Sequence, residues 1–435
     1  MAWPPSIFKR HPKGFWFIFW AELAERASFY GMRVLLALYL TEVFRFSESH
    51  AAITVQVFIA LCYFLPLLGG YLADRYLGKY RTIVYFAVPY ILGHVILGAL
   101  TTKFFLFLAL LLLAMGSGAI KPNTSTLMGL MYEKEGKGEL LDEAFSYFYL
   151  AINIGAALSS LSLPIVRDAY GYETAFLVPT GLMILALFIF VLGRRFYPQE
   201  NKTLVPRTKT DQEKAEDRVQ LYRLAPIFGL LAVFWFVYDQ NASTWVFFAR
   251  SNVNLVLWPF EVKLSADQLQ GLNPVLIILL TPFFNWFWRT WAKKQKKELA
   301  APYKMAIGFI LVTGCMALIS LAGFLSERGN VSVWFIMAAT LIMTMAELCV
   351  SVIGLHFAFS EATPRMKSTL MAAFLLSQFM GDGLGAGFDR LYDVLSHGLY
   401  FGIQALILGT ATVAFLYSAR HFTRNRPEHP AEAHR

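Results

Sequence analysis

Apolar residues occupy most of this 435-residue chain, in runs long enough to cross a bilayer, which takes about 20 apolar residues in a helix. A first set contains six runs, near residues 14–40, 51–76, 80–100, 104–131, 143–167 and 173–194. A second set contains six more, near residues 223–249, 267–291, 303–325, 331–359, 368–393 and 398–419. This pattern predicts an all-α membrane protein with about twelve transmembrane helices in two six-helix bundles.

The only long polar stretch between these runs covers residues 196–222. We therefore expect an N-terminal bundle over residues 1–195, a cytoplasmic linker over 196–222, a C-terminal bundle over 223–420 and a cytoplasmic tail over 421–435. Two bundles joined by one linker are typical of secondary transporters, whose substrate site lies between the halves near the middle of the membrane.

Composition agrees with a membrane protein, because 57% of the residues are hydrophobic, 15% are charged and the mean hydropathy is +0.51. The net charge of +9 raises the question of nucleic acid, but the basic residues lie in short stretches between apolar runs. Examples are Lys9, Arg10, Lys13, Lys79, Arg81, Lys293, Lys294, Lys296 and Lys297. If the helices alternate in direction, these stretches share one side, which predicts cytoplasmic termini in a multi-pass protein of the cell membrane, inner or plasma. We expect a lipid bilayer around the chain and no nucleic-acid partner.

The cationic start of the chain is followed by an apolar run that is longer than the core of a signal peptide and carries three charges, so we expect no cleavage. The three cysteines, Cys62, Cys315 and Cys349, all fall inside predicted spans. They offer neither a disulfide framework nor metal-ligand spacing, so we expect no metal and no cofactor.

The first run is unusual because it carries Glu22, Glu25, Arg26, Tyr30 and Arg33. At 100° per residue these side chains share one face of a helix over about 16 Å of rise. A charge at the centre of a bilayer costs roughly 2.5–3.5 kcal/mol, so this face must look into a bundle or a cavity. The alternative is a purely structural salt bridge, which the i, i+4 spacing of Glu22 and Arg26 allows.

The second run ends in the sequence GGYLADRYLGKYRT, residues 69–82, which places Asp74 and Arg75 at a helix end and Gly78 in a tight turn. The stretch resembles the loop signature between helices 2 and 3 of the major facilitator superfamily. Its glycines allow close helix approach, and Asp74 can accept from a helix N-terminus or an arginine and hold one gating state closed. The alternative is a solvated basic loop.

Two polar residues stand deep inside the fourth and fifth runs. Lys121 precedes Pro122, which removes a backbone donor, so we expect a local break in this helix and an anionic partner for the lysine. Asn153 is the strongly polar side chain of the fifth run, and it suits a hydrogen bond between helices as well as it suits a ligand contact.

The second set of runs contributes acids and amides. Asp239 and Glu347 have no evident partner within their own helices, and Asn273 lies beside Pro274. Intramembrane acids of this kind mark proton sites or hold a substrate amine.

Five segments in order resemble signatures of the proton-coupled oligopeptide transporter family, a branch of the major facilitator superfamily. They are ELAERASFYG at 22–31, IKPN at 120–123, FYLAINIGA at 148–156, LNP at 272–274 and the stretch around Glu347. The similarity covers essentially the whole chain, and the combination of segments is far more specific than the ExxER motif alone.

The resemblance implies roles for particular residues of this chain. A peptide carboxylate would be bound by Arg26, Arg33 and Lys121. The peptide amine would be bound by Asn153, Asn273 and Glu347. The side-chain pockets would be lined by Tyr30, Tyr63, Trp235 and Phe374. Proton coupling would involve Glu22, Glu25, Arg26, Lys121 and Asp239, with Asp239 as a switch that pairs with a basic group when the extracellular side closes.

We therefore expect a proton-driven symporter that imports di- and tripeptides by alternating access and functions as a monomer. A zwitterionic substrate would bridge the cations of the first half and the acids of the second half. The alternatives are a related carrier for nitrate or other organic anions, or for peptide-like drugs. An enzyme or a channel fits less well, because the chain has no HExxH, GxSxG or Walker-type motif and its buried charges are spread over both halves.

Four positions depart from the family pattern. Phe29 replaces a common tyrosine, Phe374 replaces a usual tryptophan, and Asp382 follows Gly381 where asparagine is common. Gln56 stands at the place of a histidine found in animal members, which excludes proton coupling through a histidine there.

Overall fold

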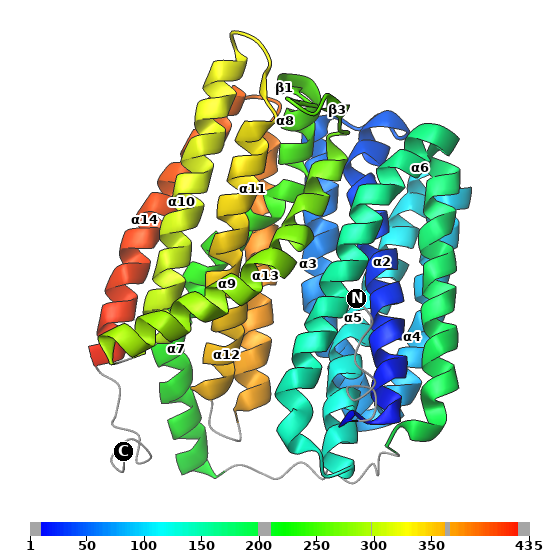
Figure 1. Cartoon of the computed structure of the whole chain (residues 1–435), viewed down its shortest axis with the longest axis vertical. Helices are drawn as coiled ribbons and strands as arrows, with labels where there is room; N and C mark the ends of the chain where they lie inside the picture. Colours follow the sequence, from blue (N-terminus) through cyan, green and yellow to red (C-terminus); the bar gives the residue numbers. More distant parts are fainter. Residues whose placement is uncertain (1–9, 199–209, 297, 362–365, 425–435) are drawn as a thin grey trace.

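The structure is a computed structural model that describes residues 10–198, 210–296, 298–361 and 366–424. It is a bundle of long helices with two short pairs of strands at one end (Figure 1). The first half of the chain forms α2 (Lys13–Glu42), α3 (Glu48–Leu72), α4 (Lys79–Ala99), α5 (Lys103–Lys134) and α6 (Leu141–Leu192). The second half forms α7 (Asp211–Tyr238), α8 (Thr244–Asn252), α9 (Leu272–Gln295), α10 (Ala301–Ser326), α11 (Trp334–Glu347), α12 (Ile353–Ser360), α13 (Lys367–Phe388) and α14 (His397–Arg424).

Nine helical segments of the described residues are long and apolar enough to cross a membrane, so the chain is a multi-pass membrane protein. One of these segments, Gly138–Phe196, turns back on itself at Gly171, whose φ of +83° is a conformation that glycine adopts without strain. α2 of the first half and α13 of the second half pack alongside the other long helices but are not among the nine segments. α2 is the helix that carries the charged face described above. The count of twelve spans and the side on which the termini lie stay predictions.

The helices alternate in direction, so α2 begins and α14 ends at the same end of the bundle, the lower end in Figure 1. The strands lie at the opposite, upper end. There β1 (Val253–Asn254) pairs in parallel with β4 (Val331–Ser332), and β2 (Val256–Leu257) pairs antiparallel with β3 (Val262–Lys263).

Three helices change their hydrogen-bonding pattern next to acids that the sequence singled out. The irregular segments are the π-helix η1 (Ala73–Leu77), the 3₁₀-helix η4 (Asp239–Ala242) and the π-helix η6 (Leu348–Val352). The acids are Asp74 and Asp239 inside their segments and Glu347 directly before its own. Irregular turns of this kind free backbone groups and re-aim side chains, and they are common at functional sites.

Small residues let the helices of the first half approach closely. A Cβ atom added to Gly155 of α6 would lie 2.5 Å from the carbonyl oxygen of Leu23 in α2. One added to Gly69 of α3 would lie 2.5 Å from the Cα atom of Ala119 in α5. Backbone contacts as close as these tolerate only glycine, and they fix the faces of α2 and α5 that turn toward the centre.

The expected break at Pro122 is wrong, because α5 runs without interruption from Lys103 to Lys134. The amide of Asn123, directly after the proline, fastens α5 at this level, since its Nδ2 donates to the carbonyls of Ala119 at 2.7 Å and of Gly69 in α3 at 3.2 Å. Bonds from a neighbouring side chain and close packing are known to keep proline-containing transmembrane helices continuous.

The linker predicted over residues 196–222 overlaps the first part of α7, and the boundaries of the two bundles stay predictions. α7 begins at Asp211, twelve residues before the predicted start of the second bundle at 223. The apolar pattern did not predict the first residues of α7 as helix because they are polar, and a helix can extend beyond the membrane with a polar sequence. Residues 199–209 of the predicted linker, the tail beyond 424, and Lys9 and Lys297 lie outside the described residues.

Candidate functional site: the central cavity

A cavity of about 240 Å³ lies between the two halves of the chain. Both halves line it. The first half contributes α2, α3, α5 and α6, and the second half contributes α7, η4, η5 (Asp267–Gly271), α9, α11, η6, α12 and α13. The cavity collects ten residues that the sequence assigned to the site: Tyr30, Arg33, Tyr63, Lys121, Asn153, Trp235, Asp239, Asn273, Glu347 and Phe374. These residues come from nine separate helical elements, so the fold and not the local sequence brings them together.

Two cations of the first half, Arg33 and Lys121, face the cavity, and they contact different kinds of partner. Arg33 donates to Asp239 Oδ1 across the halves at 2.6 Å, and its guanidinium also lies over the ring of Tyr30 at 5.9 Å. Lys121 lies over the ring of Tyr63 at 4.9 Å and forms no ion pair with any described residue. Lys121 is therefore the lining cation whose charge is available to an incoming anion.

The second half presents an acid held by an amide. Asn273 Nδ2 donates to Glu347 Oε2 at 2.8 Å and to Thr344 Oγ1 at 3.1 Å. Opposite them, Asn153 of α6 donates to the carbonyl of Tyr149 at 2.9 Å, which leaves its own carbonyl oxygen as an acceptor. The two acids thought to be unpaired thus have partners on other helices: Arg33 for Asp239 and Asn273 for Glu347.

Aromatic side chains form part of the wall. Trp235 and Phe374 meet edge to face with their ring centroids 6.2 Å apart and an angle of 87° between the rings. Both are at most 4% exposed, and the Nε1–H of Trp235 has no hydrogen-bond partner among the described residues. A buried indole donor without a partner beside a polar cavity is free to bond to a ligand or to water.

The charged cluster of α2 lies behind this wall. Glu22, Glu25 and Arg26 are each 2–3% exposed, and Arg26 Nε contacts both glutamates, Glu22 at 3.3 Å and Glu25 more closely. None of the three lines the main cavity. Arg26 instead faces a small space of about 10 Å³ that it shares with Tyr30, Arg33, Tyr63 and Lys121. Arg26 thus shares this space with Arg33 and Lys121 but does not line the main cavity, and its role as a carboxylate ligand stays a prediction.

The structure does not bring Asp74 and Arg75 to the cavity. They lie at the lower end in η1, where Asp74 pairs with Lys79 and Arg75 donates to the hydroxyl of Tyr71 at 3.3 Å. The expected partner of Asp74 was a helix N-terminus or an arginine, and the observed one is a lysine five residues later. Because Lys79 belongs to the same half, this pair does not join the halves here.

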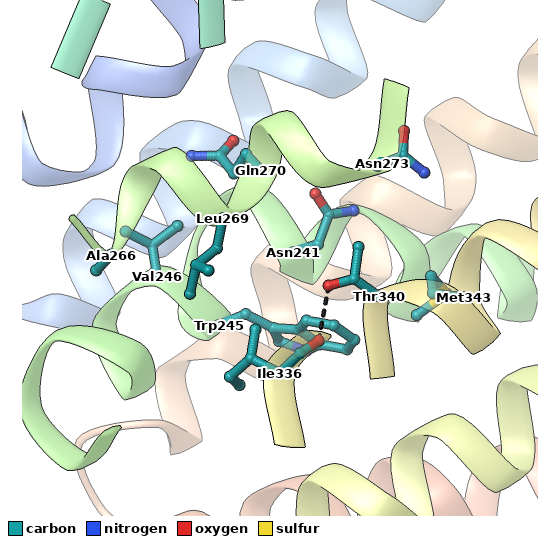
Figure 2. A pocket seen from close by; sticks show the side chains of 10 residues that line it. All are labelled: Asn241, Trp245, Val246, Ala266, Leu269, Gln270, Asn273, Ile336, Thr340 and Met343. Atoms are coloured by element: carbon teal, nitrogen blue, oxygen red, sulfur yellow. Dashed lines mark hydrogen bonds between the residues drawn. The ribbon is translucent and has the colours of Figure 1, made fainter. Parts of the chain in front are cut away.

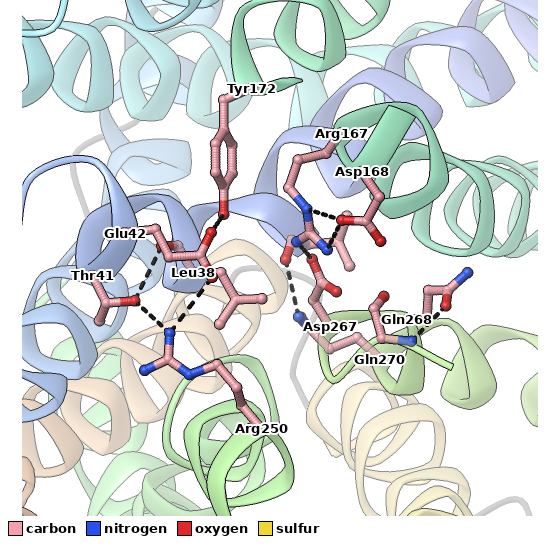
Figure 3. Close-up of polar contacts among 12 residues, drawn as sticks. Leu38, Thr41, Glu42, Arg167, Asp168, Tyr172, Arg250, Asp267, Gln268 and Gln270 are labelled. Carbon is pink, nitrogen blue, oxygen red and sulfur yellow. Dashed lines mark hydrogen bonds and ion pairs between the residues drawn. The ribbon is translucent and has the colours of Figure 1, made fainter. Parts of the chain in front are cut away.

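Figure 3 shows polar contacts between residues of the two halves, among them Arg167 with Asp267 and Arg250 of α8 with Thr41. Arg167 of α6 pairs with Asp267 before α9, and this pair is buried. Arg250 of α8 donates to Glu48 of α3 at 2.7 Å and to Thr41 at 3.0 Å. Together with Arg33 and Asp239, these contacts join the two halves between the cavity and the upper end, which we take as the closed end.

A smaller pocket of about 20 Å³, room for about one water molecule, adjoins the cavity on this closed side (Figure 2). It shares Asn241, Gln270 and Asn273 with the main cavity. Sequence reasoning missed Gln270 and Asn241, and also the cavity residues Tyr149, Ser160, Tyr238, Ser351 and Gln378. Gln270 lies two residues before the LNP motif and three before Asn273, and this i, i+3 spacing is the signal that could have found it.

A helical membrane protein with a charged cavity between two halves, closed at one end by ion pairs, is a secondary carrier by its architecture. Comparison with known proteins agrees. The POT family model matches residues 80–210 and 200–399. The chain therefore belongs to the POT family, and it is a transporter and not an enzyme.

Individual relatives extend over most of the chain. Dipeptide and tripeptide permease B of Aliivibrio fischeri (strain MJ11) is 30% identical over 84% of this chain and 83% of the permease. Human solute carrier family 15 member 2 is 32% identical over 72% of this chain and 50% of the carrier. Among solved structures, the POT family transporter PepTSo matches with a TM-score of 0.84 and 25% identity over 96% of this chain and 99% of that one. A peptide transporter POT in complex with sulfate matches with a TM-score of 0.86 and 26% identity, over 95% and 96% of the two chains.

Proposed function

We propose that this protein is a symporter that carries di- and tripeptides into the cell together with protons. The observation that carries the proposal is the cavity. On the wall of the first half it offers Lys121, a cation that pairs with no acid of the described residues, and on the wall of the second half an acid with an amide, Glu347 and Asn273. A peptide is a zwitterion whose two charged ends match these two walls. The relatives named as peptide permeases support the same substrate class.

Arg33 is occupied by Asp239 in this state, so Lys121 is the first contact for the peptide carboxylate. The amine then approaches Glu347, Asn273 and the carbonyl oxygen of Asn153. A substrate that contacts both walls draws the halves together, which is the differential contact that alternating access requires. Tyr30, Tyr63, Trp235 and Phe374 are assigned to the peptide side chains.

Protons act through the cluster of α2 in this proposal. Glu22 and Glu25 both hold Arg26, which neighbours Lys121 in the small space behind the wall. Protonating one glutamate removes a negative charge from this neighbourhood and changes how strongly Lys121 attracts an anion. Asp239 provides the second step, because its bond to Arg33 exists only while the upper end is closed.

The orientation follows from the same reasoning. If the termini are cytoplasmic, the upper end is extracellular and this conformer faces inward. We place Asp74 and Arg75 in the gate of the other, outward-facing state, where their end of the bundle closes. We infer an inner or plasma membrane location and a monomer as the functional unit.

The test is uptake into proteoliposomes that contain the purified protein, with an imposed pH gradient. A labelled dipeptide should accumulate above its external concentration, and the accumulation should collapse when a protonophore is added. A channel cannot concentrate a neutral dipeptide, so equilibration without accumulation would refute the carrier.

The same vesicles distinguish the main alternative, a carrier of nitrate or other organic anions. The presence of Glu347 disfavours it, because the acid offers a counter-charge for an amine and repels a simple anion. We expect dipeptide uptake to fall on Glu347→Ala and nitrate to leave dipeptide uptake unchanged. Competition by nitrate, with no effect of Glu347→Ala, would favour the anion carrier.

A further inference from the structure

The proposed function gives no role to Asp382, a buried acid in the second half of the chain. Asp382 of α13 is 0% exposed and does not line the cavity. Neither of its carboxylate oxygens accepts a hydrogen bond from an N–H or O–H of the described residues. An ionised carboxylate in this position would be desolvated and unsatisfied, a state that folded proteins avoid.

The packing of α13 against α7 explains what Asp382 faces. A Cβ atom added to Gly381 would lie 2.5 Å from the carbonyl oxygen of Ala232, so the two helices touch at this level. One turn before Asp382, Gln378 Nε2 donates to Asp239 Oδ2 at 3.2 Å. Asp382 lies on the same face of α13 as Gln378, and a Cβ atom added to Gly385, three residues later, would lie 3.4 Å from Nε2 of Gln240, the chain neighbour of Asp239. The residues before and after Asp382 on this face thus meet Asp239 and its neighbour, which directs the Asp382 carboxyl group toward that of Asp239.

Asp239 already has two partners, Arg33 on Oδ1 and Gln378 on Oδ2. The titratable and charged groups around Asp382 are Arg33 from α2, Cys62 and Tyr63 from α3, and Asp239 from η4. One guanidinium thus stands against two carboxyl groups. If both acids were ionised, the buried group would carry a net charge of about −1, and two carboxylates in such contact cannot both stay ionised.

We propose that Asp382 and Asp239 share one proton and form a proton-binding site at the Arg33 bridge, separate from the glutamates of α2. The proton lies between an oxygen of Asp382, which donates, and an oxygen of Asp239, which accepts. With it, Asp382 gains the hydrogen bond that it otherwise lacks, and the group of Arg33, Asp239 and Asp382 is neutral.

The position of the pair links the proton to the movement of the halves. Both acids belong to the second half, so the pair stays together when the upper end opens, whereas Arg33 belongs to the first half and leaves. The remaining pair then has a negative charge without a cation and gains affinity for a second proton from the upper side. This step rests on the proposed function in one respect, namely that the ion pair between Arg33 and Asp239 breaks when the upper end opens.

Asp389 offers a matched comparison seven residues later. It is also 0% exposed, but its Oδ1 accepts from Gln240 at 2.8 Å and from Tyr400 at 2.7 Å. Asp389 therefore has donors for its charge, whereas Asp382 faces another acid.

The experiment is infrared spectroscopy of the purified protein in lipid vesicles near neutral pH without peptide, in the carbonyl-stretch region of protonated carboxylic acids. We expect the wild type to show a band that shifts when all aspartates carry ¹³C in the side-chain carboxyl group. The isosteric Asp382→Asn variant should lose this band. Asp239→Asn should lose the same band, because Asp382 then becomes the carboxylate partner of Arg33 and ionises. Asp389→Asn should retain it.

Three results would overturn the proposal. The first is a wild type without an isotope-sensitive aspartic acid band, which needs no variant and so does not depend on whether a variant folds. The second is a band that survives Asp382→Asn. The third is a band lost in Asp382→Asn but retained in Asp239→Asn, which would place the proton on Asp382 alone. Since no peptide is present, a failure of peptide transport leaves this measurement unaffected.

Discussion

α2 carries two charge clusters that are built differently. In the lower cluster, Arg26 contacts Glu22 and Glu25, all on one helix. In the upper cluster, Arg33 contacts Asp239, which lies 206 residues away on the opposite half. The lower cluster keeps its geometry when the halves move, so a proton is what can change it. The upper cluster breaks whenever the halves part, so it reports the conformation.

This difference separates two tasks of a coupled carrier. A group that binds a proton in both states must not depend on the gap between the halves, and the lower cluster meets this condition. A group that holds one end shut must depend on the gap between the halves, and the upper cluster meets that condition. The pairs Arg167–Asp267 and Arg250–Glu48 also join the halves and share this property. Four substitutions test the division, from the largest expected effect to the smallest.

Breaking the buried pair of the closed end should have the largest effect. Asp267→Asn leaves Arg167 without its buried carboxylate, and removing one partner of a buried pair costs about 3–5 kcal/mol. If the substitution destabilises only the conformation with a closed upper end, the ratio of closed to open molecules drops by roughly 100-fold or more. Spin labels on cysteines at Tyr170 and Val262, exposed positions of the two halves, should report longer distances.

The control for this substitution is Asp168→Asn. Asp168 contacts the same guanidinium at 2.8 Å, but its side chain is 61% exposed, so its loss should leave the distances nearly unchanged. Equal effects of the two substitutions would mean that the pair with Asp267 does not close the end.

Removing the proton acceptor of the lower cluster should abolish accumulation. Each 100 mV of membrane potential supplies about 2.3 kcal/mol per charge, which corresponds to roughly 50-fold accumulation of a neutral peptide moved with one proton. We expect Glu25→Gln, or Glu22→Gln, to lose this factor in driven uptake while peptide counterflow at equal pH persists. Glu173→Gln, at an exposed acid, serves as the control. Equal loss of both activities would assign the glutamates to the structure and not to coupling.

Removing the unpaired cation should weaken peptide binding. Hydrogen bonds to charged groups contribute about 1.5–3 kcal/mol, so Lys121→Gln should raise the KM for a dipeptide by about tenfold or more. The effect should disappear for a dipeptide amide, which has no carboxylate, and for Lys103→Gln, an exposed lysine above the ring of Phe46. An unchanged KM for the free dipeptide would move the carboxylate site to Arg33.

The smallest effect should come from the partly exposed pair at the rim. Arg250→Gln removes contacts to Glu48 and Thr41, and pairs near the surface contribute about 1 kcal/mol or less. The same spin labels should show a change of less than about fivefold in the closed-to-open ratio, and raising the salt concentration should reduce the difference between this variant and the wild type. A change as large as that of Asp267→Asn would show that the rim and not the buried pair controls closure.

Local sequence predicted the helices of this protein well, because each needs only a long apolar run, and it predicted the lower cluster because the i, i+4 geometry of one helix places Glu22 beside Arg26. It failed where a helix departs from that rule. α7 begins in a polar stretch at Asp211, and α5 continues through Pro122 with the help of Asn123, which bonds to another helix.

The chemistry of the site was visible in the sequence as residue types, since buried charges and amides stand out in apolar runs. Which of them meet was decided by the tertiary structure. Arg33 binds Asp239, Lys121 pairs with no acid of the described residues, and Arg26 lies behind the wall, because each contact depends on how one helix is rotated and packed against another. Periodicity along a single helix sets the face on which a residue lies, but the partner of that face comes from the packing of segments that are hundreds of residues apart.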